Sequence, residues 1–180
     1  AYRHFIDGEE IEAAGGGVIE MVCPSDGLPF ATIARGTGRD VDLAVRAARR
    51  AFDDSAWPRM APAERGRILS RMADLVLRDR EHLASLEARD VGKIRRSTLA
   101  DVALLARYFE YYAGAADKFG GDHIPVHEGL TAFTIREPLG VVAGIIPWNS
   151  PTQMFGRVAA AALALGNTVV LKPAEDACVT

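Results

Sequence analysis

The stretch that decides the fold is 139-LGVVAGIIPWNSPTQMFGRVAAAALALGNTVVLKPAE-175. An unbroken apolar run fills residues 141–146, as in a strand that is buried on both faces of a parallel sheet. The alanine-rich segment 152–165 predicts a helix that stops at Gly166-Asn167, and residues 168–171 predict a second buried strand. A strand, a helix and a strand in this order predict a βαβ unit, the beginning of a doubly wound fold.

Shorter β-segments lie at both sides of the helical part of the chain. Residues 18–22 and 30–34 are typical of strands and flank the turn residues Pro24-Ser25-Asp26-Gly27, which predicts a β-hairpin. Residues 131–136 alternate between apolar and polar side chains, as an exposed strand does.

Helical periodicity begins at Asp40, Pro62, Arg80 and Leu99 and predicts four helices ahead of the βαβ unit. The first helix carries a single apolar stripe, formed by Val41, Ala44, Val45, Ala48 and Phe52. The predicted fold class is therefore α/β. An N-terminal helical and hairpin segment leads into the start of a doubly wound parallel (Rossmann-like) sheet, which we expect to be incomplete at the C-terminus.

Composition excludes several classes of protein. The 180 residues carry a formal net charge of -3, which gives no basic surface for nucleic acid. Two cysteines exclude a disulfide scaffold and fit a reducing compartment, so we expect a cytoplasmic protein. No apolar segment approaches the length of a membrane span. His123 and His127 have a metal-like spacing on a helix, but Pro125 between them argues against a helix, and no metal site is predicted.

The chemistry is expected where the two predicted parallel strands end. Ligands of open α/β sheets bind at the carboxyl ends of the strands, and here these ends carry residues 147–149 and 172–175. The amide of Asn149, between Trp148 and Pro151, can donate to an oxyanion. An asparagine at this place is also a common turn residue, and the residues alone leave both interpretations open.

The same stretch resembles the aldehyde dehydrogenase superfamily, through residues 137–142, 146–149 and 166–175. Segments 5–9, 24–27, 62–65 and 90–93 are similar to that family in the same order, so the resemblance covers the whole chain. It implies the N-terminal portion of an NAD(P)-dependent aldehyde dehydrogenase that forms a homo-oligomer, a dimer or tetramer. It further implies three parts: hairpin and helices of the cofactor-binding domain (1–119), a bridging or oligomerisation strand segment (120–138) and the first βαβ of the dinucleotide-binding domain (139–180).

The resemblance implies a mechanism in which a cysteine thiolate attacks the aldehyde, hydride passes to a nicotinamide, and a glutamate activates water. Asn149 would be the oxyanion donor. The wall around the nicotinamide and its ribose would consist of Ile145, Ile146, Pro147 and Trp148. The loop that meets the adenosine ribose would contain Lys172, Ala174 and Glu175. A carboxylate at Glu175 would repel a 2′-phosphate, so the resemblance favours NAD over NADP.

The chain also departs from the family pattern. Ser150 stands where phenylalanine is common, which would leave the aldehyde pocket roomier or more polar, and Met154 matches a position that lines the aldehyde tunnel. Arg157 could meet an acidic aldehyde or lie solvated on its helix. Neither Cys23 nor Cys178 matches the nucleophile, so we expect the nucleophile and the general base downstream of residue 180. The alternative is a truncated, non-catalytic binding or assembly module of the same family.

Overall fold

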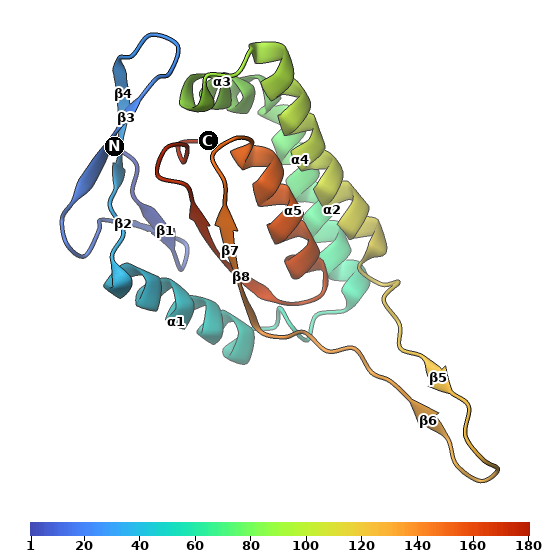
Figure 1. Cartoon of the computed structure of the whole chain (residues 1–180). Helices are drawn as coiled ribbons and strands as arrows, with labels where there is room; N and C mark the ends of the chain where they lie inside the picture. Colours follow the sequence, from blue (N-terminus) through green and yellow to red (C-terminus); the bar gives the residue numbers. More distant parts are fainter.

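The computed structural model describes residues 1–180 and contains eight strands and five helices (Figure 1). In chain order these elements are β1 (His4–Ile6), β2 (Glu9–Ile11), β3 (Val18–Val22), β4 (Pro29–Ala34), α1 (Gly38–Asp54), α2 (Pro62–Arg78), α3 (Arg80–Val91), α4 (Arg95–Ala115), β5 (His123–Ile124), β6 (Ala132–Phe133), β7 (Val141–Ile146), α5 (Pro151–Ala164) and β8 (Thr168–Pro173). The mixed α/β class predicted from the sequence is confirmed, and all four predicted N-terminal helices are present.

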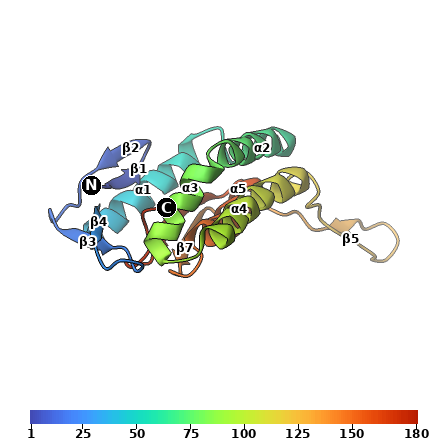
Figure 2. The same cartoon turned by 90° about the horizontal axis from the view of Figure 1, so that it is seen from above.

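The N-terminal strands form two antiparallel pairs, β1 with β2 and β3 with β4. The predicted hairpin over 18–22 and 30–34 is thereby confirmed. Figure 2 shows these strands at one end of the molecule, next to the start of α1. Asp40 in the first turn of α1 connects the two parts, because its carboxylate accepts hydrogen bonds from the backbone N–H groups of Ala14 and Thr37, each at 2.8 Å. The bond from Ala14 is the main reason that the pKa of Asp40 is lowered to about 2.

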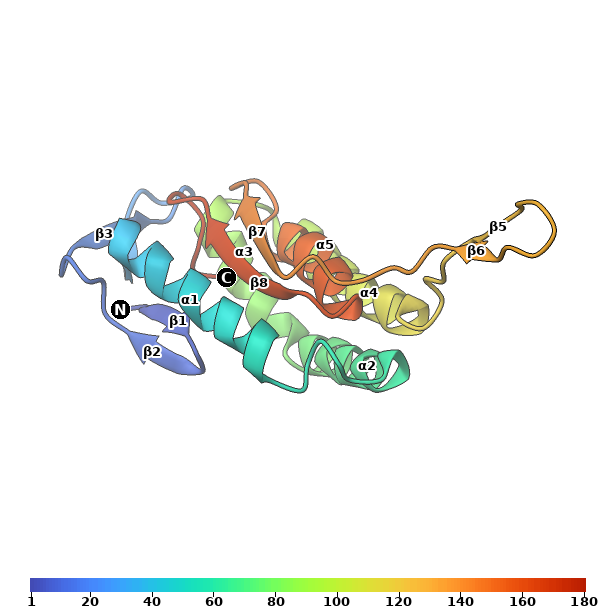
Figure 3. The same ribbon diagram turned by 90° about the horizontal axis from the view of Figure 1, so that it is seen from below.

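The βαβ unit is present as predicted. Strands β7 and β8 pair in parallel, in register from Val141 opposite Thr168 to Ile146 opposite Pro173, and α5 connects them. Helix α1 and helix α5 lie on opposite faces of this strand pair (Figures 1 and 3). The Thr168 hydroxyl donates to the carbonyl of Ala48 in α1 at 2.9 Å, which fixes α1 to its face of the pair. On the other face β7 approaches α5 closely, since a Cβ on Gly144 would lie 2.7 Å from Val158 Cγ1.

Strand β7 is not buried on both faces along its whole length, so this part of the prediction is wrong. Gly144 and Ile146 are buried toward α5, whereas Ala143 is exposed and Ile145 exposes 83% of its surface on the opposite face. The reason is that α1 covers only the beginning of that face. The predicted stripe on α1 is likewise only partly covered: Ala48 is buried, but Val41 and Val45 are exposed.

Helices α2, α4 and α5 pack into one layer that holds the main core. Small side chains dominate this layer, and they let the helix backbones approach closely. A Cβ on Gly66 of α2 would lie only 2.6 Å from the Ala113 carbonyl oxygen of α4, so only glycine fits at this contact. The buried side chains of this core are Leu69, Ala73, Leu105, Ala106, Phe109, Ala116, Ala159, Ala160 and Ala164.

A short connection after α5 joins several segments through Asn167. Its side-chain Oδ1 accepts from the N–H of Gly140 at 3.0 Å, and its Nδ2 donates to the Ala162 carbonyl at 3.2 Å. Its own carbonyl accepts from Trp57 Nε1 at 3.0 Å. Because Gly140 directly precedes β7 and Ala162 belongs to α5, this one buried residue sets the relative positions of strand, helix and the turn after α1.

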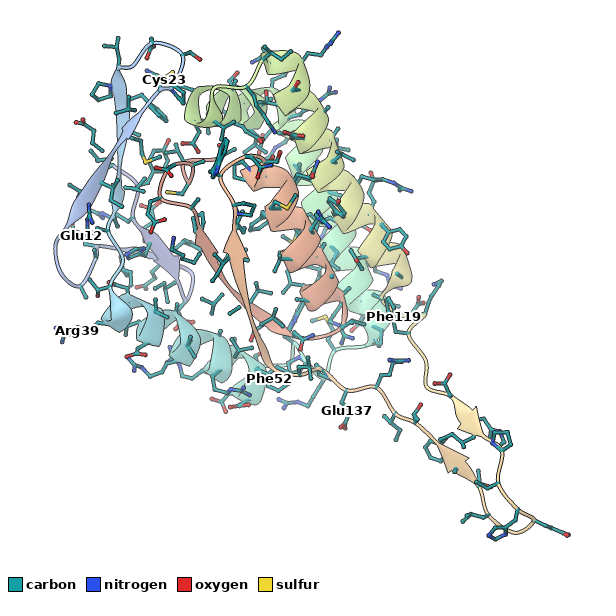
Figure 4. The ribbon with its side chains drawn as sticks, viewed as in Figure 1. Glu12, Cys23, Arg39, Phe52, Phe119 and Glu137 are labelled. Atoms are coloured by element: carbon teal, nitrogen blue, oxygen red, sulfur yellow. The ribbon has the colours of Figure 1, made fainter.

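A long arm projects from the body between α4 and β7. Phe119 and Glu137 mark the positions where the arm leaves and rejoins the body (Figure 4). The predicted exposed strand over 131–136 is much shorter in the structure, where only β6 is a strand and pairs with the two residues of β5. Pro125 follows β5 directly and has no N–H for a ladder, so the pairing does not extend toward the tip of the arm.

The hydrogen bonds of Asn167 generate the first prediction. Asn167→Ala leaves the buried N–H of Gly140 without its acceptor, so we expect the free energy of unfolding to fall by about 2 kcal/mol. Urea denaturation followed by far-UV circular dichroism measures this loss. Asn149→Ala is the matched control, because Asn149 is exposed and its side chain makes no hydrogen bond. Equal stability of the two variants would contradict the structural role of Asn167.

Candidate functional site

Two loops lie next to each other at the carboxyl end of the strand pair. Residues 147–149 follow β7, and residues 174–176 follow β8. The register pairs Ile145 with Lys172 and Ile146 with Pro173, so both loops begin at the same edge of the sheet. Pro147, Trp148 and Asn149 are all exposed, and Trp148 exposes 58% of its surface. The structure thus brings together the amide, the indole and the charged loop that the sequence suggested.

Asn149 lies in the turn between β7 and α5. Its side chain makes no hydrogen bond to the rest of the chain and is exposed, so both amide N–H donors are free. Helix α5 begins two residues later at Pro151, whose fixed φ suits a first helical turn. Asn149 therefore presents an unpaired donor from a turn that is bounded by a strand and a helix.

The residues with an expected cofactor role fall into two environments. Ile145 is almost fully exposed, whereas Ile146 points to the opposite, α5-covered face of the strand and is buried. After β8, the Lys172 ammonium contacts the Glu175 carboxylate at 2.9 Å, and both side chains are exposed. This hydrogen bond from Lys172 lowers the pKa of Glu175, so the carboxylate is ionised at neutral pH. Ala174 between them is half-buried.

Beneath the Asn149 turn lies a group of buried and half-buried polar side chains that the sequence did not reveal. Lys93 Nζ donates to Asp101 Oδ2 and to Ser150 Oγ, each at 2.5 Å. The Thr152 hydroxyl donates to the carboxylate of Glu87, which is 0% exposed. We name Glu87, Lys93 and Asp101 the charged anchor. A signal existed in the sequence, since Asp101 interrupts the apolar stripe of α4 between Leu99 and Val102.

The two expected substrate residues lie at the start of α5. Ser150 is buried, and its hydroxyl faces Lys93. Met154, half-buried one turn further along α5, lies with its sulfur 3.9 Å from a guanidinium nitrogen of the exposed Arg157.

Neither cysteine of the chain has the properties of a thiolate nucleophile. Cys23 is buried at the start of the turn between β3 and β4 (Figure 4). Burial, with the nearby Asp90 carboxylate, raises the pKa of Cys178 to about 11, so this thiol is protonated at neutral pH.

No three His, Cys, Asp or Glu side chains are grouped so that they could hold a metal ion. None of the helices has the length and apolar content to cross a membrane.

The charged anchor predicts a specific pH dependence of stability. Burial raises the pKa of Glu87 from 4.5 to about 7, and the nearby Asp101 adds to this effect. Between these two pH values the folded chain keeps a proton that the unfolded chain has lost, so stability falls as the pH rises from 4.5 to 7, by up to about 3 kcal/mol. Glu87→Gln removes this loss and flattens the pH dependence over that range.

Urea denaturation at several pH values between 4.5 and 8 measures the effect, with the exposed Glu64→Gln as control. The difference in stability between Glu87→Gln and the parent should move in favour of the variant as the pH rises. A difference that is constant with pH would contradict the raised pKa.

Comparisons with known proteins give one consistent family. The aldehyde dehydrogenase family model matches residues 11–180. The chain is 47% identical over 174 residues to the aldehyde dehydrogenase family 2 member C4 of Arabidopsis thaliana. It superposes with a TM-score of 0.96 and 54% identity on a Burkholderia cenocepacia protein assigned to the aldehyde dehydrogenases, covering 98% of this chain and 37% of that one. For a betaine aldehyde dehydrogenase of Staphylococcus aureus in complex with NAD⁺, the TM-score is 0.94 and the identity 36%, over 98% of this chain and 36% of that one.

The matches extend over nearly the whole of this chain but over much less of its relatives. The alignment with the Arabidopsis relative covers 96% of this chain and 35% of that protein, so the chain spans about a third of the length of the relatives. The residues that the family model matches include the β3–β4 hairpin, the helical layer and the βαβ unit with its Asn149 turn. The chain belongs to the aldehyde dehydrogenase family.

Proposed function

We propose that this chain is the N-terminal part of an NAD-dependent oxidoreductase that oxidises an aldehyde to a carboxylic acid. The observation that carries the proposal is the free amide of Asn149 at the carboxyl end of β7, beside the exposed Ile145 and the charged loop after β8. Family membership supports the reaction class. The NAD⁺ complex of the Staphylococcus aureus relative supports the cofactor.

The residues at the strand ends fit a dinucleotide. Ile145 and Trp148 offer exposed apolar surface for a flat ring, and the backbone of Ile146 and Pro147 completes this wall. The ionised carboxylate of Glu175 can accept hydrogen bonds from ribose hydroxyls, next to Lys172 and Ala174. When bound, NAD supplies the hydride acceptor of the reaction. We therefore assign cofactor binding to these seven residues.

Asn149 acts on the aldehyde oxygen. When a thiolate adds to the carbonyl carbon, negative charge develops on that oxygen, and a fixed amide N–H stabilises it by hydrogen bonding. The two cysteines of this chain are buried or protonated, so we propose that the nucleophile and the glutamate base lie outside residues 1–180. The aldehyde would lie along Met154, with the room that Ser150 leaves in place of a larger side chain.

The arm supports a proposal about assembly. Several of its apolar side chains are exposed, among them Phe133, Ile135 and, where the arm rejoins the body, Leu139, which exposes 91% of its surface. Isolated two-residue strands are marginal unless other strands or helices cover them. We propose that residues 120–138 bridge to another part of the enzyme or to a second subunit of a homo-oligomer.

The two cysteines are both free thiols, which fits a reducing compartment, and we propose that the protein acts in the cytoplasm.

The oxyanion role of Asn149 gives a kinetic prediction. In the intact enzyme Asn149→Ala should lower kcat by roughly 10²–10³, because one oxyanion donor is lost while the fold is unchanged. NADH formation with an aliphatic aldehyde measures the effect. Gln153→Ala, which removes a neighbouring amide from α5, is the control and should remain within about twofold of the parent. A normal turnover of Asn149→Ala would remove this residue from the chemistry.

Cofactor preference gives a second prediction for the intact enzyme. We expect kcat/KM with NAD to exceed that with NADP by about tenfold or more, because the Glu175 carboxylate repels a 2′-phosphate. Glu175→Gln removes this repulsion and leaves the Lys172 ammonium free to attract phosphate, so the preference should narrow about tenfold. Asp176→Asn, the exposed acidic neighbour, is the control. A parent enzyme that prefers NADP would overturn the assignment of Glu175.

A further inference from the structure

Two hydroxyl groups at the start of α5 are each held by the charged anchor. Ser150 Oγ accepts from Lys93 at 2.5 Å, and Thr152 Oγ1 donates to Glu87. Lys93 precedes α4 and Glu87 belongs to α3, so both contacts join α5 to the helices behind it. Asn149 directly precedes the first of these two hydroxyls.

Within the anchor, Glu87 and Asp101 are buried, and Lys93 is half-buried and paired with Asp101. Lys93 contacts Asp101 at 2.5 Å, and their side chains are only 28% and 12% exposed. Removing one partner of such a pair leaves a buried charge without its partner, which is strongly destabilising. The Lys93 ammonium is therefore a fixed donor, and the position of Ser150 Oγ depends on it.

Ser150 is the residue before the first turn of α5, where serine commonly caps the helix with its own hydroxyl. Here it makes no such bond, because its backbone has φ -159° and ψ 64° and its side chain is turned to Lys93. The exposed Asn149 side chain makes no hydrogen bond within the chain. The place from which it projects is set by the backbone on both sides, that is, by β7 before it and by Ser150 after it.

We propose that Ser150 is a positioning residue, whose hydrogen bond from Lys93 holds the backbone of the turn from which the Asn149 amide reaches the aldehyde oxygen. The proposal rests on the oxyanion role of Asn149 proposed above. It assigns to Ser150 a function that differs from lining the aldehyde pocket. It also gives the partly buried Lys93–Asp101 pair a role beyond stability.

The test is a double-mutant cycle in the intact enzyme. Ser150→Ala removes the hydroxyl and keeps the Lys93–Asp101 pair, and it should lower kcat by about 10- to 100-fold, since small displacements of a catalytic group have effects of this size. Ser150→Thr keeps a hydroxyl and should restore most of the activity. In the Asn149→Ala background, Ser150→Ala should cause no further loss, because the group it positions is absent.

A control variant and a comparison of two aldehydes distinguish a positioning role of Ser150 from a role in lining the aldehyde pocket. Ser70→Ala, at an exposed serine of α2, should leave kcat unchanged. With a short and a bulky aldehyde, Ser150→Ala should lower kcat equally and leave KM within about twofold, whereas a pocket-lining residue would change KM differently for the two. Equal losses in the parent and Asn149→Ala backgrounds, or a Ser150→Ala enzyme with normal kcat, would overturn the proposal.

The oxyanion role of Asn149 and the positioning role of Ser150 are tested by different variants. If Asn149→Ala retains full activity, the oxyanion role fails, whatever Ser150 does. If Asn149→Ala loses activity and Ser150→Ala does not, only the positioning role fails. Thermal unfolding of each variant accompanies the kinetics, and a fall in kcat at an unchanged melting temperature supports positioning over loss of fold.

Discussion

The hydrogen bonds of Asn167 fix the starting positions of the two parallel strands whose ends carry the candidate site. Its amide group joins the residue before β7 to the last turn of α5, and its carbonyl holds Trp57 from the turn after α1. Since Gly140 also accepts from the N–H of Thr168 at 3.0 Å, both parallel strands begin at this point. Strands of equal length that begin together also end together, so the loops after β7 and β8 meet at one edge of the sheet.

The helical layer then determines how far that edge can move. Close contacts such as that of Gly66 with the Ala113 carbonyl leave little freedom for α2 to shift against α4. Helix α5 packs on the same core through Ala159, Ala160 and Ala164. The N-terminal end of α5, and with it the Asn149 turn, is therefore carried by a rigid layer, while the opposite side of the turn faces solvent.

Local signals in the sequence were sufficient to predict the βαβ unit and the two loops that meet at the carboxyl end of its strands. The apolar run at 141–146, the Gly166-Asn167 stop and the turn at 147–149 each reflect interactions between near neighbours. The sequence could not show that the face of β7 with Ile145 is exposed while the face with Ile146 is covered. An unbroken apolar run carries no information about which helix covers which face. The length of the strand in the arm was also missed, since it depends on a partner segment of only two residues.

The charged anchor could not be predicted because its three residues come together only in the folded chain. Glu87, Lys93 and Asp101 are ordinary helix and loop residues by local propensity, and they become a group only when α3, α4 and α5 pack together. Buried ionisable groups cost stability unless they are paired and hydrogen-bonded, and apolar residues of similar size would fill the same space at lower cost. In this molecule the costly group lies directly beneath the one turn with a free amide donor. Packing alone does not require charges there, whereas the hydrogen bonds of Lys93 with Ser150 and of Thr152 with Glu87 hold the start of α5 with a directionality that apolar contacts do not supply.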